Sequence, residues 1–146
     1  WTDKGVYVSQ DLEAKGLSEP LNVETLEKSL QGGKDFNGIR FSEDWKVRFA
    51  PKGSYRLGEH TPESLSKDGF MIASFNTDGA KMIGEASSKF RNNPCIYGVE
   101  VQEGQNPVLR VSALGEYFDD DGLWFDGGSF GDFRGGDAFG VQTQAP

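Results

Sequence analysis

The stretch from Gly53 to Met71, GSYRLGEHTPESLSKDGFM, limits the fold more than any other part of this sequence. It carries the start and stop signals of a short helix. Thr61 is a residue type that caps helix N-termini, Pro62 suits the first helical position, and Glu63 stands in the first turn. Gly69 is a typical helix end. A short helix is therefore expected between two extended segments.

The segments around this helix predict an irregular order of strands and helices. Short runs rich in apolar, β-branched and aromatic residues are typical of strands, and apolar residues repeating on one face are typical of helices. The expected elements are strands at 45–50, 54–57, 70–75, 95–101 and 107–114 and a helix at 77–90. Because strands and helices do not alternate regularly, the pattern favours an α+β fold with a largely antiparallel sheet over a doubly wound parallel sheet.

The length of 146 residues predicts a single domain with two parts. Residues 1–44 are expected to form a helical or irregular extension packed on a core of residues 45–146. Within the extension, an amphipathic helix is expected over 22–31, with Asn22 as its N-cap. Because Trp1 is not a start methionine, we expect the chain to be a processed or excised piece.

Composition excludes several kinds of partner. The formal net charge of −8 argues against binding through nucleic-acid phosphates. No apolar run approaches the ~18 residues that span a membrane. The one cysteine, Cys95, cannot form an intramolecular disulfide and is interpreted as a small buried apolar residue. Charged residues from Lys46 to Arg56 are all basic. This local strip indicates either an anionic small molecule or partner, or ordinary surface charge.

The stretch 55–70 resembles the opening motif of the ADP-ribosyltransferase toxins of the cholera–pertussis type. The matching residues, in the family's order, are Tyr55, Arg56, Pro62, Glu63, Leu65, Gly69 and Phe70. The resemblance covers residues 48–114 and has a slightly different spacer. It implies two packed, mostly antiparallel sheets around an NAD cleft, with NAD as the substrate. It also implies a secreted or delivered toxin that acts in the cytoplasm of a target cell, with a protein target or a cognate immunity protein as its partner.

The resemblance assigns NAD-binding roles to four residues. Arg56 would hold the diphosphate, because a guanidinium donates two parallel hydrogen bonds to phosphate, and Tyr55 beside it is the second NAD-binding residue of the motif. Ser74, expected on a strand, would support the nicotinamide pocket; the alternative is a serine bonded to the backbone. His60, the only histidine, would bond the ribose, or would be a solvated loop side chain beside the helix cap.

The family's catalytic glutamate has no clear counterpart. Its late strand corresponds to residues 139–144, FGVQTQ, which carry Gln142 and Gln144 where carboxylates are expected. Related NAD glycohydrolase toxins place a glutamine in a glycine-rich final segment. Cleavage of the nicotinamide–ribose bond develops positive charge, so an acid is still required. Asp137 is the first candidate and Glu116 the second, and ADP-ribose would pass to a macromolecule or to water.

Residues 116–140 are rich in glycine, acid and aromatic residues, which predicts a long mobile loop that covers a ligand or contacts a target. Their spacing does not fit an EF-hand or a nonapeptide calcium repeat, so no metal is expected. Two alternatives to an enzyme stay open. One is a non-catalytic or calcium-dependent binding module, and the other is an acidic immunity or adaptor protein.

Overall fold

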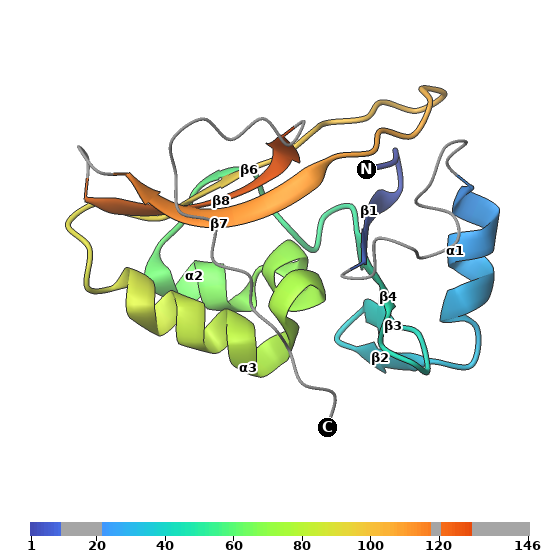
Figure 1. Cartoon of the computed structure of the whole chain (residues 1–146), viewed down its shortest axis with the longest axis horizontal. Coiled ribbons are helices and arrows are strands. Elements are labelled where there is room, and N and C mark those ends of the chain that lie inside the picture. The colour runs from blue at the N-terminus through green and yellow to red at the C-terminus, as the bar shows by residue number, and fades with distance from the viewer. Residues whose placement is uncertain (10–21, 118–120, 130–146) are drawn as a thin grey trace.

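The computed structural model describes residues 1–9, 22–117 and 121–129. These residues form two four-stranded sheets together with three helices. All strand pairs are antiparallel except β6 with β8. The predicted α+β class is therefore confirmed (Figure 1). Within the described residues, no helix is long and apolar enough to cross a membrane.

The first sheet is covered on both faces. Its order is β1-β4-β3-β2, made of β1 (Gly5–Ser9), β4 (Val47–Pro51), β3 (Ile39–Phe41) and β2 (Lys34–Phe36). Helix α1 (Val23–Leu30) packs on one face, where Tyr7 and Phe49 join Leu26 in a buried cluster. Val8 and Ala50 belong to the main core on the other face. Coverage of both faces explains why β1 and most of β4 are buried rather than alternating.

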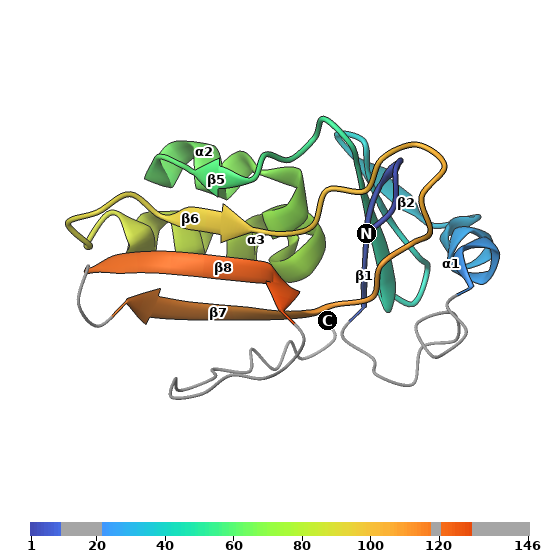
Figure 2. The same ribbon diagram turned by 90° about the horizontal axis from the view of Figure 1, so that it is seen from above.

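The second sheet lies over two helices. Its order is β5-β6-β8-β7, made of β5 (Gly58–Glu59), β6 (Cys95–Tyr97), β8 (Gly122–Ser129) and β7 (Val111–Tyr117). Helices α2 (Pro62–Lys67) and α3 (Gly69–Ser87) cover the same face of this sheet (Figures 1 and 2). Ile96 and Phe125, which are register partners, are buried on that face.

Helix α3 joins the two halves. It contacts β1, β3 and β4 of the first sheet, and its residues share one buried cluster with Ile96 and Phe125 of the second. Phe70, for example, packs on Phe125 with ring centroids 4.7 Å apart. The sheets therefore meet through a helix, whereas the resemblance implied two sheets packed together around a cleft.

The strands predicted at 95–101 and 107–114 are present with other bounds, as β6 and β7, and the other three predicted strands differ more. Residues 70–75 are the first turns of α3, not a strand, because a short apolar run fits a buried helix as well as a buried strand. Residues 54–57 form no regular element, and the two-residue strand β5 follows them. The strand predicted at residue 45 begins at Val47, since Trp45 has a positive φ of 62° in the preceding turn.

Two broader expectations also need correction. The segment 1–44 contains β1, β2 and β3 as well as the confirmed helix α1, so the boundary drawn at residue 44 runs through the first sheet. The loop expected over 116–140 instead contributes the end of β7 and all of β8. Its remaining residues, 118–120 and 130–140, lie outside the described part of the chain.

Candidate functional site

The candidate site is the corner between residue 55 and residue 71, where the arginine motif meets two helices. Helix α2 begins as predicted. Thr61 Oγ1 accepts a hydrogen bond from Ser64 N at 3.1 Å, and Ser64 Oγ accepts one from Thr61 N at 3.0 Å. This reciprocal capping satisfies two backbone N–H groups that the helix itself leaves unpaired. The capping box fixes the end of α2 next to His60.

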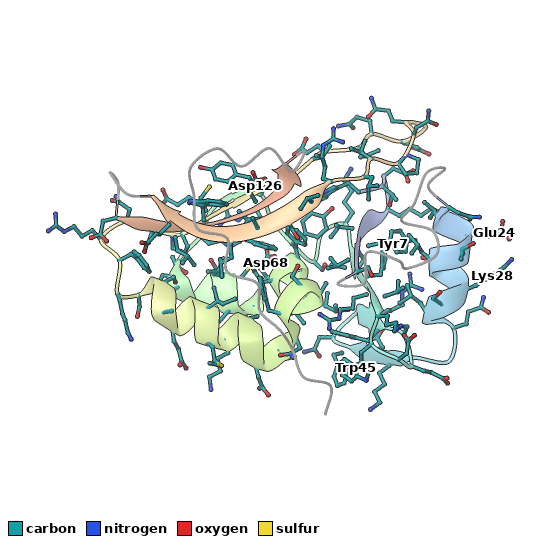
Figure 3. The ribbon with its side chains drawn as sticks, viewed as in Figure 1. Tyr7, Glu24, Lys28, Trp45, Asp68 and Asp126 are labelled. Carbon is teal, nitrogen blue, oxygen red and sulfur yellow. The ribbon has the colours of Figure 1, made fainter. Side chains whose placement is uncertain are left out.

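Asp68 is the centre of the corner. It ends α2 and caps α3, because its Oδ1 accepts hydrogen bonds from Phe70 N at 2.9 Å and Met71 N at 3.3 Å. Its Oδ2 accepts a hydrogen bond from Arg56 N at 2.9 Å. One buried carboxylate thus ties the arginine segment to the start of α3. Figure 3 labels Asp68 in its place between α3 and the second sheet.

His60 holds the same segment from the other side. Its Nε2 lies 2.7 Å from Arg56 O, and since a carbonyl only accepts, Nε2 carries the proton. In the neutral ring, Nδ1 then accepts from Ser64 Oγ at 3.1 Å. Nε2 also lies 3.8 Å from Asp68 Oδ2. Both backbone groups of Arg56 are therefore anchored by buried side chains.

Burial sets the electrostatics of the corner. It raises the pKa of the Asp68 carboxyl above the ordinary value of 3.8, and the hydrogen bonds from Arg56 N, Met71 N and Phe70 N together with His60 act against that rise. Burial also raises the pKa of Tyr55, with smaller contributions from the negative charges of Asp68 and Glu100. Both raised pKa values show that the side of the corner facing the start of α3 is shielded from water.

The Arg56 side chain points away from this buried network. It is exposed, and its Nη2 donates to Glu59 O. Tyr55, beside it, is half-buried and packs edge-on against Trp1, with centroids 5.6 Å apart, and at 6.3 Å from Phe70. The structure therefore presents the Arg56 guanidinium to solvent on a fixed backbone.

His60 and Ser74 do not occupy the positions expected from the sequence. His60 is only 3% exposed and both of its ring nitrogens face protein atoms, so neither a solvated loop position nor an open ligand contact describes it. Ser74 is buried in helix α3 rather than on a strand. Its backbone carbonyl accepts a hydrogen bond from Arg48 at 3.0 Å.

Arg48 is a feature that the sequence reasoning missed, since it was counted in a surface basic strip. It is 5% exposed, and its Nη1 donates to Ala73 O and Ser74 O, both at 3.0 Å. These carbonyls end the first part of α3, which breaks at Asn76 with φ 60° and ψ 179°. Burial lowers the pKa of Arg48, but a cation at a helix C-terminus is favoured by the helix dipole.

Of the two predicted catalytic carboxylates, the structure describes Glu116 alone, and Glu116 does not lie beside Arg56. Glu116 lies exposed on β7. Its neighbour Gly115 shares a cross-sheet row with Glu59 of β5, and three strand spacings separate them, roughly 14 Å. Asp137, Gln142 and Gln144 lie outside the described residues. The described structure therefore brings Tyr55, Arg56 and His60 together but places Glu116 across the sheet.

Asp68 was detectable in the sequence. An aspartate directly before an apolar run is an N-cap signal. Interpreting residues 70–75 as a strand hid that signal, because strands have no caps. Gly69 was expected to end a helix, yet it begins one. A Cβ at this position would lie 2.7 Å from Ser54 O, so glycine permits the close approach of two backbone segments.

Within the described residues, no group of three or more His, Cys, Asp or Glu side chains is arranged to hold a metal ion. Comparison with protein-family models, with curated proteins and with solved structures gave no match to this chain.

Proposed function

We propose that this chain is an NAD-consuming toxin or effector domain that cleaves the nicotinamide–ribose bond, as an ADP-ribosyltransferase or an NAD glycohydrolase. The observation that supports this most is the Arg56 side chain, exposed on a backbone that Asp68 and His60 anchor from inside. Preorganisation lowers the ordering cost of gripping an anion. The diphosphate of NAD fits the planar, two-point geometry of a guanidinium.

In this proposal the buried residues of the corner position Arg56, and the more exposed residues bind NAD. Arg56 binds the diphosphate, with the half-buried Tyr55 beside it. His60 and Asp68 act only through the Arg56 backbone. The carboxylate that stabilises the developing ribose cation is Asp137, with Glu116 as the second candidate, and Gln142 or Gln144 orients a ribose hydroxyl or the attacking water.

The direct experiment follows free nicotinamide after incubation of the purified chain with NAD, with and without cell lysate. Release without lysate identifies a glycohydrolase, and release only with lysate identifies transfer to a macromolecule. No release in either case, with NAD still bound in calorimetry, would instead indicate a binding module. No release and no binding would refute the proposal.

Arg56→Lys tests the anion site itself. Lysine keeps the charge and loses the two-point grip, so NAD affinity should fall by about 1.5–3 kcal/mol, the size of a charged hydrogen bond. Arg91→Lys is the matched control, because the Arg91 side chain is 89% exposed and is ion-paired with Asp121, which is not a residue of the corner. Equal NAD binding by Arg56→Lys and the unmodified chain would remove Arg56 from the site.

The acid is separated from the binding residues by kinetics. Asp137→Asn or Glu116→Gln should slow nicotinamide release by roughly 10²-fold or more, with little change in NAD affinity, if that residue stabilises the transition state. Gln142→Ala should have a smaller effect. Unchanged release in both acid variants would show that neither acid is the catalytic group.

A further inference from the structure

Strand β7 has an edge with few of the features that normally block strand addition. It runs over seven residues, VSALGEY, at the margin of the second sheet (Figure 2), and among the described residues it pairs with β8 alone. The register shift near Val111 places the extra residue in β8, so β7 itself stays regular. It holds no proline or lysine and one charge, Glu116. An edge of this kind is a template for another strand.

Together with Arg110, the residue just before it, the strand is also self-complementary in charge. If two copies of β7 pair antiparallel about Ala113, residue numbers that face each other sum to 226. Arg110 of one chain then faces Glu116 of the other, and the two-fold axis repeats the pair. Glu116 is exposed and has no ion-pair partner among the described residues. Opposite charges directly across an antiparallel pair stabilise it.

On the other face of the strand, the facing positions are apolar. In the same register, Val111 of one chain faces Gly115 of the second copy. Val111 is 49% exposed. Gly115 is covered by an indole, because a Cβ there would lie 2.8 Å from Trp124 Cε2. The Val111 side chain would thus pack against the ring of Trp124, which already covers the glycine, and lose its exposure to water.

We propose that β7 is a homodimer interface, in which two copies pair through this strand and join their second sheets into one continuous eight-stranded sheet. The interface is separate from Arg56, because β7 lies at the opposite margin of the sheet from β5. It includes Glu116, the second candidate for the catalytic acid, so the readout of the test is the mass of the chain and not its activity. Edge pairing buries a modest area, so the dimer forms with rising protein concentration instead of being obligate.

The test is the mass of the whole chain in solution, measured by sedimentation equilibrium over a wide range of concentrations. The unmodified chain should move from 16.0 kDa toward twice that mass. Glu116→Arg should weaken the dimer roughly 10-fold by placing like charges opposite each other, and Arg110→Glu should do the same. The double variant restores opposite charges and should restore the dimer. Glu103→Arg, the same charge change at an exposed loop position, should leave it unchanged.

Circular dichroism and thermal midpoints establish that each variant is folded before its mass is interpreted. A chain that is monomeric at every concentration overturns the proposal. The edge of β7 would then be used by the chain's own residues beyond Ser129, by a different protein, or not at all. Single variants that dimerise like the unmodified chain overturn it as well. A double variant as weak as the singles would show that Arg110 and Glu116 do not face each other, which also overturns the proposed register.

Discussion

Two carboxylates that join helices to the rest of this molecule, Glu27 and Asp68, are satisfied in opposite ways. Glu27, on α1, accepts two hydrogen bonds from the Arg40 guanidinium, at 2.8 and 3.0 Å, and one from Tyr7 Oη. Asp68, between α2 and α3, accepts only backbone N–H groups at hydrogen-bonding distance. The first carboxylate is 40% exposed and the second is 2% exposed.

The pKa shifts follow this difference. Hydrogen bonds from Arg40 hold the pKa of Glu27 below its ordinary value, and burial acts against them. Burial raises the pKa of Asp68, and its backbone hydrogen bonds act against the rise. A charged partner near the surface thus favours an ionised side chain, whereas a buried site without an adjacent guanidinium fixes geometry at an electrostatic cost. Asp68 therefore orders the corner more than it stabilises a charge.

The largest effect should come from removing Asp68. Asp68→Ala loses the cap of α3 and leaves the partly buried N–H of Arg56 without its acceptor, and we expect a loss of about 3 kcal/mol of unfolding free energy. Asp68→Asn is the matched variant, since its amide oxygen can still cap the helix, and it should recover part of the loss. Urea unfolding measures both. Equal losses in the two variants would show that the charge, and not the cap, is what the site needs.

Arg48→Met should have the next largest effect, about 2 kcal/mol. The change leaves Ala73 O and Ser74 O without their donor inside the protein, although it also removes a buried charge. Arg48→Lys keeps the charge at the end of the first part of α3 but loses the forked geometry of the guanidinium. Its stability should therefore lie between those of Arg48→Met and the unmodified chain. Denaturant midpoints give the order. An unchanged midpoint for Arg48→Met would mean that the desolvation cost of the guanidinium cancels its hydrogen bonds.

Local signals in the sequence predicted those features of the fold that depend on neighbouring residues alone. The caps of α1 and α2 were correctly placed at Asn22 and Thr61, because each side chain bonds its own first turn. The class followed from the irregular order of elements. Strand β1 was not predicted, because its partner β4 is distant in the sequence and both faces of the pair are covered. Such a strand shows no alternation, so tertiary contacts alone define it.

The candidate site was predictable to a lesser degree. The motif brought Tyr55, Arg56 and His60 to one corner, as the structure does, because they lie close in sequence. Nothing local indicates that Arg48 is buried, since its donors reach carbonyls on α3 that are 25 and 26 residues away. The same applies to Trp1, whose indole Nε1 donates to Gly127 O across the chain at 2.6 Å.

Gly69→Ala tests how tightly the backbone next to Asp68 is packed. The substitution adds a methyl group that meets Ser54 O at 2.7 Å, where the chain preceding Tyr55 crosses the start of α3. Overpacking of this kind should lower the unfolding free energy by roughly 1.5 kcal/mol, although alanine is otherwise a better helix former than glycine. Thermal unfolding measures the change. A stabilised Gly69→Ala variant would show that the corner is loose enough for Ser54 to move away.

The smallest effect should come from Glu27→Gln, about 0.5 kcal/mol near neutral pH. The side chains of Glu27 and Arg40 are each more than a third exposed, so solvent screens their attraction. Because the pKa of Glu27 is lowered in the folded state, its contribution is complete above the ordinary pKa of 4.5 and is lost as the pH falls through the folded value.

Asp68 should show the opposite dependence on pH. Because its folded pKa is raised, the stability linked to its proton is complete below 3.8 and is lost as the pH rises through the folded value. Urea unfolding of the unmodified chain, Glu27→Gln and Asp68→Asn across the acid range therefore gives two trends of opposite sign. The advantage of the unmodified chain over Glu27→Gln should grow with pH, and its advantage over Asp68→Asn should shrink. Parallel trends would mean that Asp68 is as well compensated by backbone N–H groups and His60 as Glu27 is by Arg40.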